Sequence, residues 1–390
     1  MNVLFISSDN NKTSGAFRCL VEINHYIRQY TDINTIVVLP KNGDGVELLD
    51  QYNIPYVMIP SYSWITYKGI GIKAVAKTIF KAMMVFYNLY AITKIRALIK
   101  KEKIDIVHTN TIFSYVGAYA AYKENIPHLW HLREDIYKDY NSRVLNSNYG
   151  YGLIKKSSYI IAVSNVIKKA YEKKMLPKEI SVVYDGVSAE LYNEREILKK
   201  SKTTFTCIGA FVSHKNQSEL IKACHVLKDK GIRNFQVKLV GRGPDEAKLK
   251  KLVQNFNLEN EVEFCGIYDD IKEILEITDV LCVTSISEAF GRTTVEGMLQ
   301  GCLVVGAESE QSATHELIEH GVNGYLYESG NVAELSERLL MCSNSDNFNK
   351  LRLIARQGQM KAKDEYVTGK NVGNIIDIYS EIVRLNKMKK

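Results

Sequence analysis

Two glutamates, Glu288 and Glu296, stand eight residues apart in the segment with the clearest chemical pattern, residues 285–298. An expected strand, residues 280–283, precedes them, and a helix is expected to begin near Thr293. Glu288 then lies on a strand-to-helix loop, where Gly291 permits close backbone approach and the helix start favours an anionic ligand. One structural alternative stays open. Thr293 to Glu296 has capping-box spacing, so Glu296 could merely close its helix.

A lysine after another expected strand, residues 205–209, could supply the cation that an anionic ligand needs. Gly209 ends this strand, and Lys215 follows it on the next loop. An ammonium group at such a place can neutralise the charge that grows on a departing phosphate. Arg242, after the expected strand 236–240, is another possible phosphate contact. Lys215 taken alone could equally be a solvated lysine before a helix.

The first half of the chain offers matching positions at the ends of its own strands. Gly15 follows the first strand and could let backbone N–H groups approach phosphates, although it could also be an ordinary glycine at a helix start. His131 ends the expected strand 128–131, and Arg133 and Glu134 follow it. These two could orient His131 or meet an acceptor. A lone histidine is more often structural, and we interpret His108 as mainly structural.

The elements that must position these residues alternate between short apolar strands and amphipathic helices. This pattern predicts an α/β fold with parallel sheets. Two series of strands predict two Rossmann-like domains, residues 1–193 and 203–370, and a helix at 371–390 is expected to pack back on the first. Two such domains facing each other would form an interdomain cleft at the carboxyl ends of their strands, where these sheets bind ligands. The expected strands are 3–7, 34–39, 56–59, 104–108, 128–131 and 159–163 in the first series, and 205–209, 236–240, 262–265, 280–283, 302–306 and 324–327 in the second.

Composition indicates a cytoplasmic globular protein. The chain has 390 residues, 46% of them hydrophobic and 24% charged. Its seven cysteines form no C-x-x-C pair and lie mostly in apolar runs, so we expect them to be buried and reduced. The apolar N-terminus indicates a first strand rather than a signal peptide. No apolar stretch is expected to reach the roughly 20 residues that span a bilayer.

Glu288 through Glu296 resembles the E-x7-E motif of the family-4 retaining glycosyltransferases, which have the GT-B fold. The resemblance implies that Glu288 lies by the donor sugar and that Glu296 binds the ribose hydroxyls. The backbone of Phe290, Gly291 and Arg292 would approach the sugar. Residues 208–217 resemble the family's G-R-L-x-x-x-K segment, which places Lys215 on the donor diphosphate. The family's usual arginine is replaced by Ala210, so Arg242, His214 or Arg292 would have to substitute for it.

The same resemblance extends to the first half of the chain and to the reaction. Gly15 would face the donor phosphates, and His131 would touch the donor sugar or the acceptor, so the expected catalytic residues are Glu288, His131 and Lys215. The implied reaction is retaining transfer of a hexose-type sugar from a nucleotide sugar, expected to be a UDP-sugar. The acceptor would be a saccharide, expected to be lipid-linked, in surface polysaccharide synthesis. No D-x-D pair is present, so we expect no metal requirement and no other cofactor.

A basic and apolar stretch, residues 66–104, is a candidate for contact with the inner face of the cell membrane. It contains one acid, Glu102, and apolar or aromatic residues lie between its basic residues. It could lie on anionic lipid as a peripheral membrane helix, or it could be a core helix with a solvated basic face. The nine basic residues are Lys68, Lys73, Lys77, Lys81, Lys94, Arg96, Lys100, Lys101 and Lys103.

Competing functions have weaker support. A nicotinamide oxidoreductase would need a G-x-G-x-x-G motif, but after Gly241 and Gly243 the third glycine position holds Glu246. A nucleotide-sugar epimerase of the same overall shape is a nearer alternative. The net charge of +7 would permit nucleic-acid binding, yet no motif for it is present, and we expect none.

Overall fold

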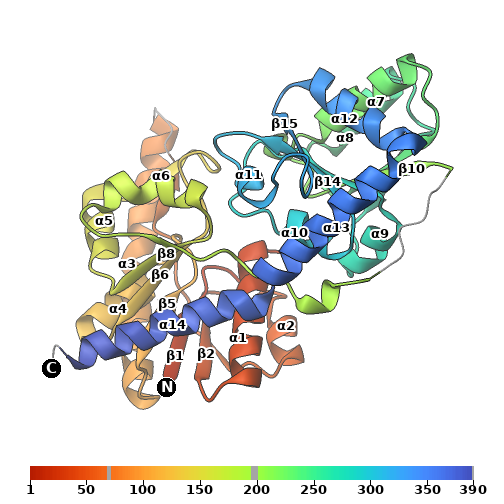
Figure 1. Ribbon diagram of the computed structural model, residues 1–390. Coiled ribbons are helices and arrows are strands. Elements are labelled where there is room, and N and C mark those ends of the chain that lie inside the picture. Colours follow the sequence, from red (N-terminus) through yellow and green to blue (C-terminus); the bar gives the residue numbers. More distant parts are fainter. Residues whose placement is uncertain (68–71, 195–200, 389–390) are drawn as a thin grey trace. The chain divides into compact units, whose positions relative to one another are not determined.

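The computed structural model describes residues 1–67, 72–194 and 201–388, which form two compact units (Figure 1). Unit 1 contains Met1–Gly186 and Thr368–Lys390, and unit 2 contains Val187–Val367. The sequence-based division at 193–203 therefore lies a few residues beyond the first boundary between the units. Lys68 of the basic stretch and residues 195–200 of the expected linker lie outside the described residues.

Unit 1 is built on a seven-stranded parallel sheet with the order β3-β2-β1-β5-β6-β8-β9. Its strands are β1 (Asn2–Ile6), β2 (Asn34–Leu39), β3 (Tyr56–Met58), β5 (Ile106–Thr109), β6 (His128–Leu132), β8 (Tyr159–Ala162) and β9 (Ser181–Val182), with a separate antiparallel pair, β4 (Ile65–Tyr67) and β7 (Ser142–Val144). Its helices are α1 (Gly15–Tyr30), α2 (Val46–Gln51), α3 (Ile72–Lys101), α4 (Val116–Glu124), α5 (Ser147–Lys155), α6 (Asn165–Met175) and α14 (Thr368–Lys387).

Unit 2 repeats this plan with a six-stranded parallel sheet of order β12-β11-β10-β13-β14-β15. Its strands are β10 (Thr203–Ile208), β11 (Phe235–Val240), β12 (Val262–Gly266), β13 (Val280–Val283), β14 (Leu303–Glu308) and β15 (Tyr325–Glu328). Its 3₁₀ helices are η1 (Ala189–Leu191), η2 (Ser213–Lys215) and η3 (Ser345–Asn347). Its α-helices are α7 (Gln217–Asp229), α8 (Glu246–Asn255), α9 (Ile271–Ile277), α10 (Arg292–Leu299), α11 (Thr314–Leu317), α12 (Val332–Ser343) and α13 (Phe348–Glu365).

Both sheets form from short apolar runs because their central strands are buried on both faces. Residues such as Phe5, Ile161, Phe205 and Val305 are completely covered, and helices pack on either side. The strand order reverses between β1 and β5 in unit 1 and between β10 and β13 in unit 2. In doubly wound sheets, ligands bind at the carboxyl ends of the strands at this reversal. The reversal therefore marks the place where each unit is expected to bind a ligand.

The C-terminal helix α14 belongs to unit 1, where it packs against α1 (Figure 1). Val372, Ile375 and Tyr379 of α14 are completely buried in the unit 1 core. At the start of this helix, Gly369 lies directly against the ring of Tyr26. Helix α14 thus completes the first unit, although it follows the second in sequence.

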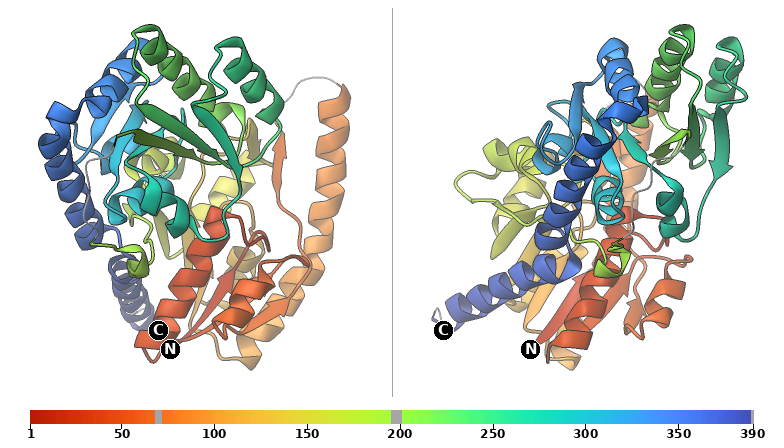
Figure 2. Two further views of the ribbon diagram at one scale, coloured as in Figure 1. Left: turned by 90° about the vertical axis from the view of Figure 1, so that its right-hand side faces the viewer. Right: turned by 45° about the vertical axis from the view of Figure 1, so that its right-hand side comes forward.

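Helix α3 stands at one edge of unit 1 (Figure 2). An 18-residue window within its segment Thr78–Lys101 has a mean hydropathy of 1.2, and by length and composition alone this segment could cross a membrane. The expectation that no stretch reaches spanning length is therefore wrong for this helix. That expectation treats each lysine as the end of an apolar run, whereas the helix continues through its lysines.

Candidate functional site

In unit 2, Lys215 and Glu288 form an ion pair at the reversal of strand order. The Nζ atom of Lys215 lies 2.5 Å from Oε1 of Glu288, and the two side chains are 24% and 15% exposed. Lys215 ends η2, on the loop after β10, and Glu288 lies on the loop after β13. The structure thus brings together the two residues of unit 2 that the sequence predicted to be catalytic. Lys215 is paired with a carboxylate and is not simply solvated.

Backbone and hydroxyl hydrogen bonds hold the loops that carry this pair. The Thr284 hydroxyl donates to the Lys215 carbonyl at 2.8 Å, and the Ile286 N–H donates to the His214 carbonyl at 2.8 Å. On the other side, the Ala313 N–H donates to the Glu288 carbonyl, also at 2.8 Å. Hydrogen bonds between the loops that follow β10, β13 and β14 therefore hold the backbone of both residues in place. A preorganised site requires such support.

Glycines allow the loops after β10 and β11 to approach each other closely. Gly241 has a φ of +143°, and a Cβ atom there would lie 2.1 Å from the Gly209 carbonyl oxygen. The N–H of Phe211 donates to the carbonyl of Arg242 at 2.9 Å. This bond places Arg242 beside Ala210, the position where the resemblance leads one to expect an arginine. Arg242 is exposed and remains a candidate substitute for that cation.

Helix α10 begins at Arg292, and Gly291 precedes it in the left-handed conformation with a φ of +99°. The Nε atom of Arg292 lies 3.7 Å from Oε1 of Glu296, one helical turn away. Gly291 is the residue that precedes the helix and Thr293 lies inside it, so Thr293 does not form the capping box considered for Glu296. The ring of Phe290 is buried and lies edge-on to the ring of Tyr366, with 5.9 Å between the ring centres. The backbone of Phe290 is therefore the part that could meet a ligand.

In unit 1, the loop after β1 leads through Asp9 to the start of α1. The Ser14 hydroxyl caps the helix by accepting from the Phe17 N–H, and it donates to Oδ2 of Asp9 at 2.9 Å. Burial raises the pKa of Asp9, partly offset by Ser14 and by the charge of Lys41. Gly15 is the first helical residue, and no atom lies within 4 Å of where its Cβ would be. This open helix start has the geometry that anions prefer.

A chain of three buried side chains links His131 to the C-terminal helix. His131 Nδ1 lies 3.3 Å from Nε2 of His108, whose Nδ1 lies 2.6 Å from the Tyr379 hydroxyl. Nη2 of Arg133 lies 3.2 Å from the same Nδ1 of His131. Because a guanidinium group can only donate, Nδ1 of His131 must accept, and its proton belongs on Nε2. His108 then donates from Nε2 and accepts the Tyr379 proton at Nδ1.

Both histidines are neutral in this arrangement. Burial and the nearby charge of Arg133 hold the pKa of His108 and of His131 well below the usual 6.5. The Nε2 atom of His131 has no hydrogen-bond partner within the described part of the chain. His131 is therefore arranged as a hydrogen-bond donor rather than as a general base. Arg133 sets the tautomer of His131, and His108, interpreted from sequence as mainly structural, supports it by donating to the same Nδ1.

Arg133 and Glu134 extend this cluster at the end of β6. Arg133 forms a buried ion pair with Asp185, and its Nε donates to the Asn110 carbonyl and side-chain oxygens at 3.1 Å. Burial raises the pKa of Glu134 to about 8, and its Oε2 atom has no hydrogen-bond partner among residues with described positions. Arg133 therefore orients His131, whereas Glu134 keeps a protonated carboxyl group with unused hydrogen-bonding capacity.

Asp9, Asp185 and Tyr379 belong to this cluster but were not among the residues predicted for the site. Asp185 follows β9, and Asp9 follows β1, as ligand-binding residues often follow strands. Tyr379 had no local signal, because it is 271 residues from His108 and meets it only in the folded unit.

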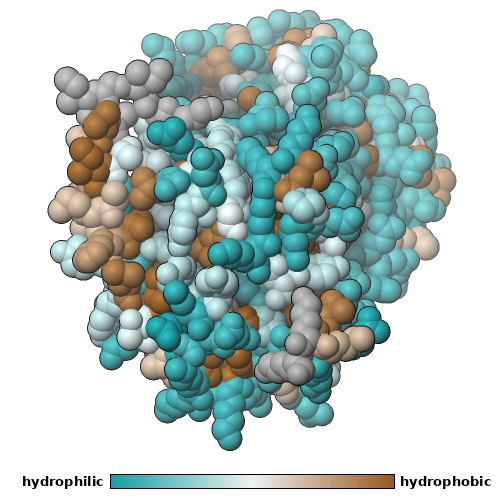
Figure 3. Space-filling model, turned by 90° about the vertical axis from the view of Figure 1, so that its left-hand side faces the viewer, coloured by the Kyte–Doolittle hydropathy of each residue, from teal (hydrophilic) through white to brown (hydrophobic). Residues whose placement is uncertain are grey.

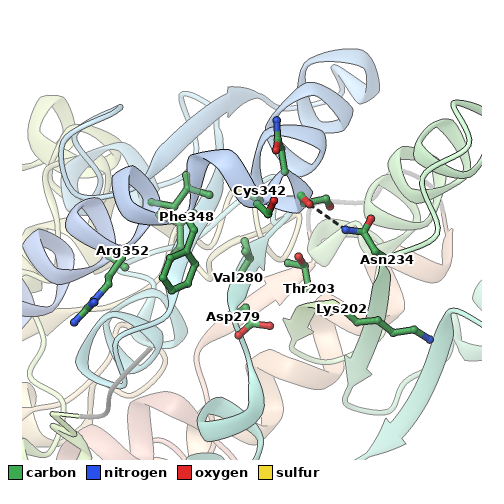
Figure 4. A pocket seen from close by; sticks show the side chains of 14 residues that line it. Lys202, Thr203, Asn234, Asp279, Val280, Cys342, Phe348 and Arg352 are labelled. Atoms are coloured by element: carbon green, nitrogen blue, oxygen red, sulfur yellow. Dashed lines mark hydrogen bonds between the residues drawn. The ribbon is translucent and has the colours of Figure 1, made fainter. Parts of the chain in front are cut away.

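A separate pocket of about 100 Å³ in unit 2 lies away from these residues (Figure 4). Thr203, Val280 and Leu303 line it, and each is the first or amino-terminal residue of its strand. The pocket therefore opens at the edge of the sheet opposite to Lys215 and Glu288. It belongs to the packing of α13 and η3 against the sheet, not to the candidate site.

Two doubly wound parallel sheets, each with polar residues at its reversal of strand order, are the architecture of the GT-B fold. Two family models match the sequence: "Glycosyl transferases group 1" over residues 189–358 and "Glycosyltransferase Family 4" over residues 45–191. The chain belongs to this family of glycosyltransferases. The resemblance inferred from Glu288 and Glu296 is confirmed, as are the fold class and the enzyme class predicted from it.

Curated relatives support this assignment along most of the chain. An uncharacterized glycosyltransferase of Methanocaldococcus jannaschii is 29% identical over 78% of this chain and 82% of its own length. The N-acetyl-alpha-D-glucosaminyl L-malate synthase of Bacillus anthracis is 25% identical over 77% and 81%. The amylovoran biosynthesis glycosyltransferase AmsK of Erwinia amylovora is 30% identical over 43% of each chain.

Solved structures give the same fold. HepE of Anabaena in complex with UDP matches with a TM-score of 0.79 and 23% identity, covering 98% of this chain and all of that one. Its complex with UDP-glucose matches with a TM-score of 0.76 over the same shares.

Proposed function

We propose that this glycosyltransferase moves a hexose-type sugar from a UDP-sugar to a saccharide acceptor, with retention of anomeric configuration, in surface polysaccharide synthesis. The observation that carries the proposal is the Lys215–Glu288 pair at the carboxyl ends of the two central strands of unit 2. UDP and UDP-glucose as ligands of HepE support the choice of donor. AmsK, a relative named for amylovoran biosynthesis, supports the choice of pathway.

In the proposed reaction, the bond between the anomeric carbon and the β-phosphate oxygen breaks, and its electron pair leaves with UDP. The acceptor hydroxyl forms the new bond on the same face of the sugar, and its proton passes to the departing phosphate oxygen. Lys215 would exchange its contact with Glu288 for the diphosphate and stabilise the growing negative charge. Released from Lys215, the Glu288 carboxylate would accept hydrogen bonds from sugar hydroxyls and stabilise positive charge at the anomeric carbon.

The unit 1 cluster would serve the acceptor and the sugar in this scheme. Protonated Glu134 and the Nε2–H of His131 are donors without protein partners among the described residues, and each could bind a hydroxyl oxygen. A lipid-linked acceptor on the inner face of the cell membrane is part of the proposal. We propose no metal requirement, because Lys215 and helix N–H groups supply the positive charge, so transfer should continue in the presence of a chelator.

The proposal is tested by incubating the protein with labelled UDP-glucose, UDP-galactose or UDP-N-acetylglucosamine. Each donor is offered with a polyisoprenoid-linked saccharide, with malate or without acceptor. We expect labelled lipid-linked product from one donor, and the NMR coupling of its anomeric proton should show retention. Conversion of the donor sugar without acceptor would identify an epimerase instead, and product from malate alone would refute the lipid-linked acceptor.

Variants connect this activity to the site. Glu288→Gln should abolish transfer while the protein stays folded, because the neutral amide cannot stabilise positive charge at the anomeric carbon. Glu337→Gln, an exposed substitution on α12, is the matched control and should keep full activity. Full activity in Glu288→Gln would remove Glu288 from the site.

A further inference from the structure

The amino-terminal half of α3 exposes a large apolar surface. Val75, Ile79, Phe80, Met83, Phe86 and Tyr87 are each between 58% and 71% exposed. Figure 3 shows hydrophobic side chains gathered along this edge of unit 1. Soluble monomers rarely expose contiguous apolar patches of this kind, and larger ones mark interaction surfaces.

The other half of the helix is fixed in the protein. Ile92, Ile95 and Ile99 are at most 5% exposed, and α3 packs along α4. The buried Asn88 side chain exchanges two hydrogen bonds of 2.8 Å with the backbone of Tyr62. The helix therefore cannot rotate its apolar surface inward. It also cannot be surrounded by lipid on all sides as a membrane-spanning helix would be, although its composition would allow spanning.

The exposed surface changes from apolar to basic along one stripe. Phe80, Tyr87, Lys94 and Lys101 recur every seven residues, which places them on the same side of the helix. Lys94 lies 5.4 Å from the ring centre of Tyr90. Lys101 is 79% exposed and forms a surface ion pair of 3.0 Å with Glu102, which a lipid phosphate would have to replace. The helix contains no aspartate or glutamate from Ile72 to Lys101. Exposed aromatic residues continued by lysines are typical of helices that lie on anionic membranes.

A groove of about 470 Å³ continues the same surface toward the body of unit 1. Met58, Ile59 and Pro60 form one wall of the groove, and Tyr90, Lys94 and Leu98 of α3 form the other. The lining is apolar except for lysines at the rim. An acyl or isoprenoid chain with a phosphate group at its end has the matching chemistry.

We propose that α3 lies in the surface of an anionic lipid bilayer and docks unit 1 on it. Phe80, Met83 and Phe86 enter the acyl boundary, and Lys94 and Lys101 meet lipid phosphates. This docking deepens the proposed function by bringing a lipid-linked acceptor to unit 1, but it does not depend on which sugar is transferred.

Flotation with vesicles of phosphatidylcholine, alone or mixed with phosphatidylglycerol, tests the proposal on the full chain. We expect binding to the mixed vesicles, weakened by added salt, and much less binding to neutral ones. Lys94→Gln/Lys101→Gln should weaken binding by about fivefold for each lysine removed. Lys248→Gln/Lys251→Gln on unit 2 removes the same charge from exposed positions and should bind like wild type.

The apolar half is tested in the same way. Phe80→Gln/Phe86→Gln should lose at least about tenfold in vesicle affinity. The control Tyr30→Gln/Leu353→Gln replaces two residues of similar exposure (62% and 67%) outside α3, and it should keep the wild-type affinity for vesicles. Wild-type binding by the Phe80/Phe86 variant would overturn the proposal, as would equal binding of wild type to both vesicles.

Two further readouts distinguish membrane docking from self-association and from damage to the donor site. Light scattering that shows a dimer in wild type and a monomer in Phe80→Gln/Phe86→Gln would mean that a second copy covers the surface, which would also overturn the proposal. Binding of UDP should be unchanged in all four variants. A variant that loses vesicle binding but still binds UDP therefore has a defect in α3 and not in the donor site. Failure of the wild-type protein to bind UDP would instead contradict the proposed function.

Discussion

Glu134 should make the stability of this protein depend on pH in an unusual direction. Burial raises the pKa of its carboxyl group to about 8, nearby Asp9 raises it further, and Arg133 partly opposes both. In the unfolded chain the same group releases its proton near pH 4.5. The folded state therefore binds one more proton than the unfolded state between these two values. Stability contributed by Glu134 is complete below pH 4.5 and is lost as pH rises toward 8.

The size of this effect follows from the two pKa values. Each unit of difference between the two pKa values corresponds to about 1.4 kcal/mol, so the largest possible change in the free energy of unfolding is roughly 5 kcal/mol. Solvent near the half-buried Glu134 side chain reduces the expected change to about 2–3 kcal/mol. Glu134→Gln removes the titrating group. Packing changes in the variant act at every pH, so they cancel when each protein is compared with itself.

Urea unfolding of wild type and Glu134→Gln at pH 5 and pH 8 measures the effect. We expect the wild-type free energy of unfolding to fall by about 2–3 kcal/mol more than that of the variant between these pH values. Asp9 also titrates, but it is present in both proteins. Parallel pH profiles for the two proteins would refute a protonated Glu134, and with it the donor role proposed for this group.

Four further substitutions test the geometry of the two sites. Gly241→Ala should lower the free energy of unfolding, measured in urea, by about 2–4 kcal/mol, because its Cβ would meet the Gly209 carbonyl. Gly15→Ala has open space around its Cβ and should change the free energy of unfolding by less than about 1 kcal/mol. Equal effects of the two variants would contradict the close approach of the loops. Asp185→Asn leaves the buried Arg133 charge unpaired and should cost about 3–5 kcal/mol by the same measurement, and an unchanged value would show that the pair is not buried in solution. Tyr379→Phe removes the proton donated to His108 and should shift the ¹⁵N NMR tautomer signals of His108, with a loss of about 1–3 kcal/mol; unchanged signals would contradict the tautomers of the two histidines.

The main sheets could be predicted from sequence because their strands are continuous apolar runs. The expected strands 34–39 and 280–283 match β2 and β13 in full, and the other ten differ by one to three residues at their ends. The short strands β4, β7 and β9 were missed. They have two or three residues each, and pairing with distant segments rather than local pattern makes them strands.

The site could be predicted in part, and the difference has a physical cause. Glu288 and Lys215 each follow a strand, so local order along the chain was enough to place both at one sheet edge. The rest of the cluster around His131 could not be found in this way, because Tyr379, which contacts His108, and Asp185, which contacts Arg133, come from distant parts of the chain. The start of α10 was set by the left-handed backbone of Gly291 and not by the hydroxyl of Thr293, which removed the expected cap.

Titration calorimetry of UDP with wild type and Lys215→Gln tests the central claim most directly. Loss of a charge-assisted hydrogen bond to the diphosphate should weaken binding about 10- to 100-fold, and the unpaired Glu288 carboxylate left behind would add repulsion. Lys222→Gln, an exposed substitution on α7, should bind UDP like wild type. If Lys215→Gln instead binds UDP as tightly as wild type, the diphosphate is not held by Lys215.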